Sequence, residues 1–95
     1  MSLLGHVILI VDSRVEAFVA RLEDHLKTAG AETLVARNAE QAVQMLRCFD
    51  FTAVLLGPCI NSTELLSEIG GVPCVTYGPM TEPRAVLASV VGLRD

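Results

Sequence analysis

The sequence has few aromatic residues. It contains no tryptophan, one tyrosine and three phenylalanines, whereas 52% of its residues are hydrophobic. The core must therefore consist of Val, Leu, Ile and Ala, which is typical of buried parallel strands covered by helices rather than of an aromatic-rich β-sandwich. Since a domain usually takes roughly 100–200 residues, the length of 95 residues predicts a single domain over residues 1–95.

Basic residues are also scarce. The chain has seven Lys and Arg residues and eleven Asp and Glu residues, which gives a net charge of −4. The basic residues form no run along the chain. Binding to nucleic acid requires a basic stripe that neutralises phosphates, so we expect no nucleic-acid partner. The sequence shows neither a signal peptide nor an apolar stretch of about 20 residues, so we expect no membrane association and a cytoplasmic protein.

Paired cysteine motifs are missing. Cys48, Cys59 and Cys74 are an odd number with no CxxC spacing, which argues against a disulfide framework and agrees with a reducing compartment. A free cysteine is most often a small buried hydrophobic residue, and we expect this of all three. The sequence predicts no metal site and no cofactor.

Hydrophobic periodicity predicts four strands that alternate with four helices. Short apolar runs indicate strands, and apolar residues at helical spacing indicate helices. Asn38 with Gln41 resembles a capping box, Asn61 or Ser62 is expected to cap the third helix, and Gly30 to end the first. The predicted strands are 6–11, 31–36, 51–56 and 72–77, and the helices follow them at about 15–29, 39–49, 62–69 and 83–93. Strict alternation predicts parallel strands with right-handed crossovers and helices on both faces.

Three segments resemble receiver domains of two-component response regulators. Residues 8–12, Ile-Leu-Ile-Val-Asp, are similar to that family's first strand and acidic tip, residues 51–57 to its phosphoacceptor strand, and residues 72–75, Val-Pro-Cys-Val, to its fourth strand. The resemblance implies a flavodoxin-like, three-layer α/β/α fold with a parallel sheet of four strands in the order 2-1-3-4. The family's fifth strand is not expected in this chain.

The residues that would carry the family's chemistry are mostly replaced. The acidic pair that helps to hold Mg²⁺ is reduced to Asp12-Ser13, the phosphoacceptor aspartate corresponds to Gly57, and the Thr or Ser after the fourth strand corresponds to Gly78, or to Thr76 with a small strand shift. The only lysine, Lys27, falls within the first helix. An aspartyl phosphate needs a carboxylate nucleophile, so we expect no phosphotransfer at this position and no enzyme activity.

A different role for the same end of the sheet stays open. Ligands of open α/β sheets bind beyond the carboxyl ends of the strands. A small-molecule or nucleotide sensor would use a loop made of Asp12, Ser13, Gly57, Pro58, Cys59 and Asn61. For Asp12 alone, backbone capping is the simpler expectation.

The C-terminal part predicts a protein partner. The last helix looks apolar nearly all round, and in the strand order 2-1-3-4 the fourth strand is an unpaired edge, so both features favour association. We expect a homodimer through the last helix and the fourth strand, with a histidine kinase or another signalling protein as a further partner. The interface candidates are Val72, Val75, Tyr77, Val86, Leu87, Val90, Val91 and Leu93. The leading hypothesis is a phosphorylation-independent adaptor; the alternatives are the sensor and a dimerisation module of a larger regulator.

Overall fold

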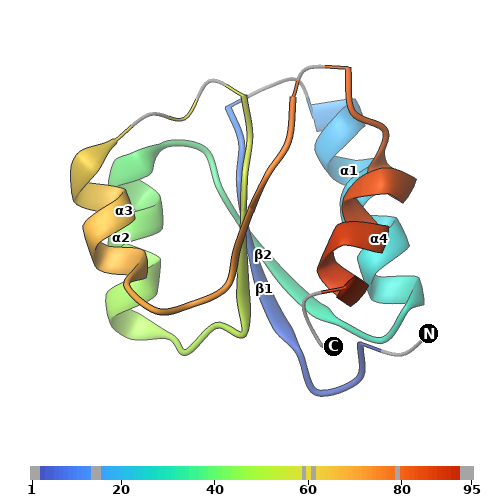
Figure 1. Cartoon of the computed structure of the whole chain (residues 1–95), viewed down its shortest axis with the longest axis horizontal. Coiled ribbons are helices and arrows are strands. Elements are labelled where there is room, and N and C mark those ends of the chain that lie inside the picture. Colours follow the sequence, from blue (N-terminus) through green and yellow to red (C-terminus); the bar gives the residue numbers. More distant parts are fainter. Residues whose placement is uncertain (1–2, 14–15, 59, 61, 79, 93–95) are drawn as a thin grey trace.

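The computed structural model describes residues 3–13, 16–58, 60, 62–78 and 80–92 and shows a parallel sheet between two layers of helices (Figure 1). The elements alternate along the chain, and the sheet order is β2-β1-β3-β4, with every neighbouring pair parallel. They are β1 (Val7–Val11), α1 (Glu16–Thr28), β2 (Glu32–Ala36), α2 (Ala39–Cys48), β3 (Ala53–Leu56), α3 (Thr63–Ile69), β4 (Cys74–Thr76) and α4 (Pro83–Gly92). The predicted flavodoxin-like α/β/α fold and its strand order are confirmed.

The burial of each strand follows from its place in the sheet. Every residue of β3 is buried, as are four of the five residues of β1, because both strands lie in the centre between helices. The edge strand β2 buries only Ala36, and β4 buries none of its three residues fully. Central strands of a parallel sheet lose water on both faces, which is why they read as continuous apolar runs.

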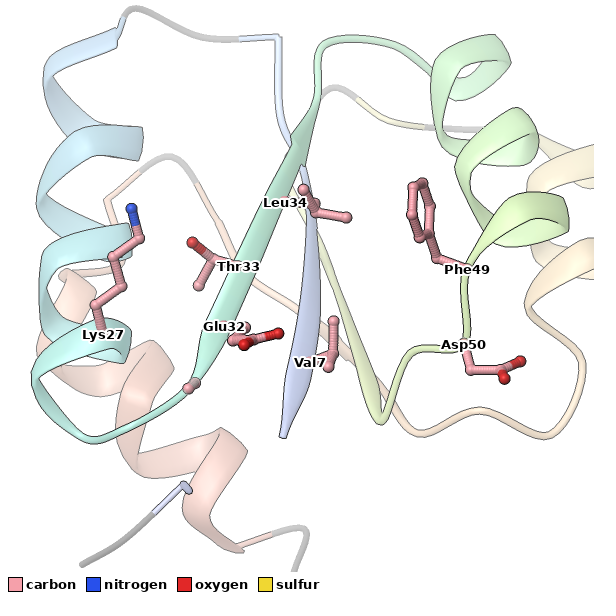
Figure 2. Close-up of a pocket in the computed structure, with 8 residues that line it drawn as sticks. Val7, Lys27, Glu32, Thr33, Leu34, Phe49 and Asp50 are labelled. Atoms are coloured by element: carbon pink, nitrogen blue, oxygen red, sulfur yellow. The ribbon is translucent and has the colours of Figure 1, made fainter. Parts of the chain in front are cut away.

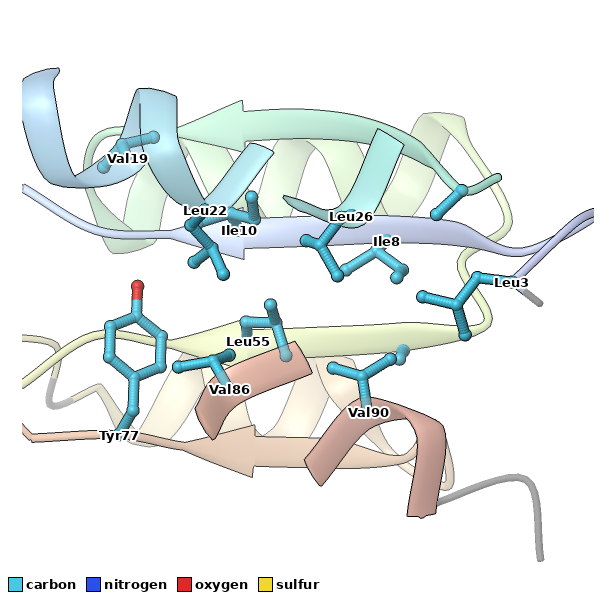
Figure 3. Close-up of a cluster of buried hydrophobic side chains, with 12 residues drawn as sticks. Leu3, Ile8, Ile10, Val19, Leu22, Leu26, Leu55, Tyr77, Val86 and Val90 are labelled. Atoms are coloured by element: carbon cyan, nitrogen blue, oxygen red, sulfur yellow. The ribbon is translucent and has the colours of Figure 1, made fainter. Parts of the chain in front are cut away.

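Two apolar clusters fill the two sides of the sheet. One lies under α1 and α4 and includes Ile8, Ile10, Leu55 and Val86 (Figure 3). The other lies under α2 and α3 and includes Leu9, Val11, Val54 and Leu65. Because successive side chains of a strand point to opposite faces, β1 supplies alternate residues to the two clusters. The core is aliphatic, as its composition predicts.

The helix ends carry the caps that the sequence predicts. The side chain of Asn38 accepts a hydrogen bond of 2.8 Å from the backbone N–H of Gln41 at the start of α2. The Ser62 hydroxyl accepts one of 3.2 Å from the N–H of Leu65 at the start of α3, so the cap there is Ser62. After α1, Gly30 has a φ of 104°, a backbone conformation that glycine adopts without a steric penalty.

The last helix differs from its prediction. Helix α4 packs against α1 and buries Pro83, Val86 and Val90, while Ala85, Ala88 and Ser89 face solvent. Its outward face therefore carries the charged Arg84 and small side chains, and none of the exposed large apolar side chains of the described residues lies on it. The expectation of excess apolar surface on this helix is wrong. Among the residues that the structure describes, no helix is long and apolar enough to cross a membrane.

Burial also corrects part of the predicted interface. Val86 is 1% exposed, Val90 2% and Tyr77 7%, all inside the core of the same chain, so these three cannot form an interface surface. Another four candidates are half-buried and keep some surface: Val72, Val75, Leu87 and Val91. The last candidate, Leu93, lies outside the described residues.

The fourth strand is shorter than predicted. The sequence predicts residues 72–77, but β4 comprises only Cys74–Thr76. At its start, the N–H of Val72 still bonds to the carbonyl of Ile69 at the end of α3, and Pro73 has no N–H to donate to a ladder. This shortening leaves β4 as a brief, exposed edge.

Candidate functional site

The carboxyl ends of three strands bring Asp12, Gly57 and Tyr77 together. Each is the residue after its strand, and backbone hydrogen bonds extend the sheet to this level: Gly57 N–H to the Val11 carbonyl at 2.8 Å, and Tyr77 N–H to the Leu56 carbonyl at 3.1 Å. These are the positions at which open α/β sheets present ligand-binding groups. The candidate site is therefore the Asp12–Gly57–Tyr77 cluster.

The cluster lies on the α1 and α4 side of the sheet. Ile10, two positions before Asp12, Leu55 before Gly57, and Val75 before Tyr77 all pack in the apolar cluster under α1 and α4. Since side chains alternate along a strand, the three cluster residues face that same side. The side chains of Asp12 and Tyr77 meet at one end of the apolar layer, where Tyr77 is drawn in Figure 3.

Asp12 is enclosed. Its side chain is 1% exposed, and its Oδ2 accepts a hydrogen bond of 2.7 Å from the hydroxyl of Tyr77. The Tyr77 ring is held in turn by stacking on Phe18 of α1, with 5.7 Å between ring centroids. A buried polar group needs such a partner, because leaving it without one costs about 1–3 kcal/mol. Tyr77 thus covers the one carboxylate that remains at this end of the sheet.

Gly57 closes the remaining space. A Cβ atom added at this position would lie 2.8 Å from Cγ and 2.9 Å from Oδ2 of Asp12, and 3.1 Å from the carbonyl oxygen of Val11. Those distances are shorter than van der Waals contact, so the backbone of β3 approaches Asp12 more closely than any other residue type allows. The glycine is required by packing here, and the position offers no nucleophile.

The other predicted positions are not part of the cluster. Ser13 is exposed, and Pro58 and Gly78 are half-buried. The N–H of Gly78 donates to Oγ1 of Thr81 at 3.0 Å, which forms the turn before α4. The loop residues Cys59 and Asn61 lie outside the described residues, so the predicted ligand loop is only partly visible.

The strand register settles which residue stands beside Gly57. Leu56 pairs with Thr76, so the residue level with Gly57 is Tyr77. Gly78, the expected counterpart of the family's Thr or Ser, follows Tyr77 by one residue. Thr76, which is exposed, precedes Tyr77 by one residue. Tyr77 is therefore the residue beside Gly57, and its size and hydroxyl fill the site.

The described residues show no metal-ligand cluster at this end of the sheet. Within the described part of the chain, no group of three or more His, Cys, Asp or Glu residues could hold a metal ion. Lys27 lies on α1 and pairs with Glu23 at 3.7 Å. It lines a groove at the opposite, amino-terminal end of the strands, far from Asp12.

That groove has a volume of about 600 Å³ (Figure 2). It surrounds the outer edge of β2, with Lys27 and Thr33 on the α1 side and Leu34 and Phe49 on the α2 side. Phe49 is 55% exposed. The groove is open and its walls hold no set of groups arranged for acid–base or nucleophilic chemistry.

Comparisons with known proteins add to the fold but not to the site. No protein-family model matches this chain, and no curated protein matches it. A solved structure described as a trimeric coiled coil of yeast Spc42, amino acids 181–211, fused to a second structure, aligns with a TM-score of 0.69 and 21% identity. The alignment covers 96% of this chain, which spans 66% of that chain. At this identity the likeness concerns the α/β fold alone.

Proposed function

We propose that this chain is a phosphorylation-independent interaction module built on a receiver-like scaffold. Three features support the proposal: the flavodoxin-like sheet order, the segments that resemble a receiver, and the loss of the groups that a receiver needs for phosphotransfer. The module acts by binding other proteins and carries out no reaction of its own.

The closed state of the Asp12–Gly57–Tyr77 cluster is the observation that carries this proposal. A phosphoacceptor carboxylate at position 57 would have to occupy space that Asp12 already fills. A metal ion on Asp12 would have to displace the Tyr77 hydroxyl from Oδ2. Mg²⁺ sites usually recruit more than one carboxylate or a phosphate, and here the only carboxylate is buried and hydrogen-bonded.

The surface for a partner is the α3–β4–α4 side of the domain. Strand β4 lies at the edge of the sheet, and the exposed apolar side chains of Leu66 on α3 and Met80 before α4 lie in the segments that flank it in sequence. An exposed strand edge with apolar neighbours favours association with another chain. A histidine kinase, another signalling protein or a like subunit fits this role.

The alternative of a nucleotide or small-molecule sensor has less support. It requires Asp12 to be available to a ligand, and this side chain is 1% exposed. A sensor would have to open the Tyr77–Asp12 contact first.

The test is exposure to a phosphoryl donor and to a phosphoryl mimic. We expect that acetyl phosphate with Mg²⁺ leaves the intact mass unchanged. Neither acetyl phosphate nor beryllofluoride should move the amide resonances of residues 11–13, 57 and 77. A receiver with a complete acidic site serves as the positive control. Stoichiometric phosphorylation that disappears in Asp12→Ala contradicts the proposal, because it shows that the cluster opens and reacts.

A further inference from the structure

The outer side of β4 presents unpaired backbone groups. On the inner side, the carbonyl of Pro73 accepts from Val54 at 2.9 Å, and the N–H of Tyr77 donates to Leu56 at 3.1 Å. Backbone groups of a parallel strand alternate between its two sides, so Val75 also faces β3 while Cys74 and Thr76 face away from it. Among the described strands, only β3 pairs with β4. Cys74 and Thr76 are therefore the hydrogen-bonding positions of a free edge, one residue on each side of Val75.

This edge has none of the charges that usually protect one. No residue between Glu68 and Glu82 is charged, a run of uncharged sequence that contains all of β4. Soluble proteins commonly guard exposed edges with charged side chains. The other edge follows that pattern: β2 begins with Glu32, and Arg37 follows its last residue. The two edges of one sheet thus differ in charge, since charged residues stand at both ends of β2 and at neither end of β4.

We propose that β4 pairs antiparallel with β4 of a second copy of this chain, about a two-fold axis at Val75. In this register Cys74 of each copy stands opposite Thr76 of the other, and the two Val75 side chains face each other. It is the register that uses both outward-facing residues of each strand. The inference rests on the proposed function. It identifies the partner at the α3–β4–α4 side as a second copy of the chain.

Charge directs two copies of the chain to this edge rather than to another surface. Two chains of net charge −4 repel each other, and they approach at least cost through the stretch from Ile69 to Thr81, which carries no charge. A two-fold contact is self-complementary, so a patch that is uncharged on one copy is uncharged on both.

The flanks of β4 provide the apolar contact. On the α3 side, Leu66 is 56% exposed and lines a hollow of about 160 Å³ together with Thr76. On the α4 side of the sheet, Val75 is half-buried against the core. Pairing at β4 covers all of these side chains, whereas the buried Val86 and Val90 take no part.

The register is tested by a disulfide between the copies. The experiment uses Thr76→Cys in the full chain with Cys48→Ser and Cys59→Ser, so that the cysteines are those at positions 74 and 76. Opposite residues of a hydrogen-bonded antiparallel pair have Cα atoms about 5.5 Å apart, which is within the disulfide range of about 4.4–6.8 Å. We expect mild oxidation to convert most of the protein to a covalent dimer on a non-reducing gel.

Three matched variants identify the link. In the Cys48→Ser, Cys59→Ser parent, only Cys74 remains, and diagonal partners in this register are roughly 7–8 Å apart, so the parent should stay monomeric on the gel. Adding Cys74→Ser to the Thr76→Cys variant should abolish the link for the same reason. Thr63→Cys in the parent places a cysteine on the exposed start of α3 and should give only background cross-linking.

The outcomes separate this inference from the proposed function. Cross-linking of Thr76→Cys no greater than that of Thr63→Cys, or efficient linking in the parent, overturns the register. Light scattering of the unmodified chain should show a mass that rises toward twice that of one chain with concentration, and a monomer mass throughout overturns the dimer. If the chain stays monomeric and is not phosphorylated, the dimer is ruled out and the proposed phosphorylation-independent function is kept.

Discussion

The hydroxyl of Tyr77 donates a 2.7 Å hydrogen bond to Oδ2 of Asp12, which joins residues 65 positions apart in the sequence. The bond connects the ends of β1 and β4 across β3, whose terminal Gly57 leaves room for the Asp12 side chain between them. Three separate sequence segments therefore determine whether this end of the sheet is closed, and each can be tested by substitution.

Gly57→Ala is expected to destabilise the fold by about 1–3 kcal/mol, the usual cost of overpacking a close-packed interior. Its Cβ would lie 2.8 Å from Cγ of the buried Asp12 and 3.1 Å from the Val11 carbonyl oxygen, and neither group is free to move aside. Urea denaturation measures the change. Gly71→Ala is the matched control, because nothing lies within 4 Å of a Cβ there, and it should change stability by no more than roughly 0.5 kcal/mol. Equal effects of the two substitutions contradict the close approach at Gly57.

Tyr77→Phe should lower stability by about 1–3 kcal/mol, because it removes a donor from a buried acceptor while keeping the ring. Ring stacking on Phe18 should persist, so near-ultraviolet spectra report whether packing is kept. In a double-mutant cycle with Asp12→Ala, we expect a coupling free energy of roughly 0.5–3 kcal/mol. Additive effects of the two substitutions would show that the hydrogen bond contributes nothing.

Val90→Glu should unfold or severely destabilise the monomer, by about 3–5 kcal/mol, because a charge without a partner would be placed in the core. Val90 lies on the buried face of α4 and is 2% exposed. Ala88→Glu, on the exposed face of the same helix, should change stability by at most about 0.5 kcal/mol. Thermal melting with circular dichroism distinguishes the two. A folded Val90→Glu variant of normal stability contradicts the packing of α4 on α1.

Cys48 and Cys74 are both exposed, so the expectation of buried cysteines is wrong for these two, while Cys59 lies outside the described residues. Cys74 should nevertheless react slowly with iodoacetamide. Partial burial raises the pKa of its thiol, so at a given pH the folded chain holds less of the reactive thiolate than the unfolded chain does. In the Cys48→Ser, Cys59→Ser parent at low protein concentration, the pH profile of alkylation should therefore have a higher midpoint in buffer than in urea. Coincident profiles contradict the shift. The slow reaction also argues against a redox-sensing role for this thiol.

Much of the fold could be predicted from local sequence. The apolar runs of β1 and β3 mark central strands because both faces of a central parallel strand lose water. Asn38 with Gln41 marks the start of α2 because a side-chain oxygen can satisfy a free backbone N–H at a helix end. The alternation of strands and helices then leaves few connections, since crossovers between parallel strands are right-handed.

The candidate site could be predicted only in part. Asp12 and Gly57 were predicted because each directly follows an apolar strand, at the end of a parallel sheet where ligands bind. The role of Tyr77 was missed because it depends on where β4 stops, and Pro73 together with the end of α3 shortens that strand. A one-residue difference in register moves the residue beside Gly57 from a small to a large side chain.

Sequence by itself determined the α/β order, the aliphatic core and the absence of a carboxylate nucleophile at position 57, because each follows from residue identity and local periodicity. Only the tertiary structure decided that Tyr77 covers Asp12, that α4 buries Val86 and Val90 against α1, and that β4 is an uncharged strand at the edge of the sheet. Those features depend on which residues meet across long sequence separations, and side-chain packing, not local propensity, sets that outcome.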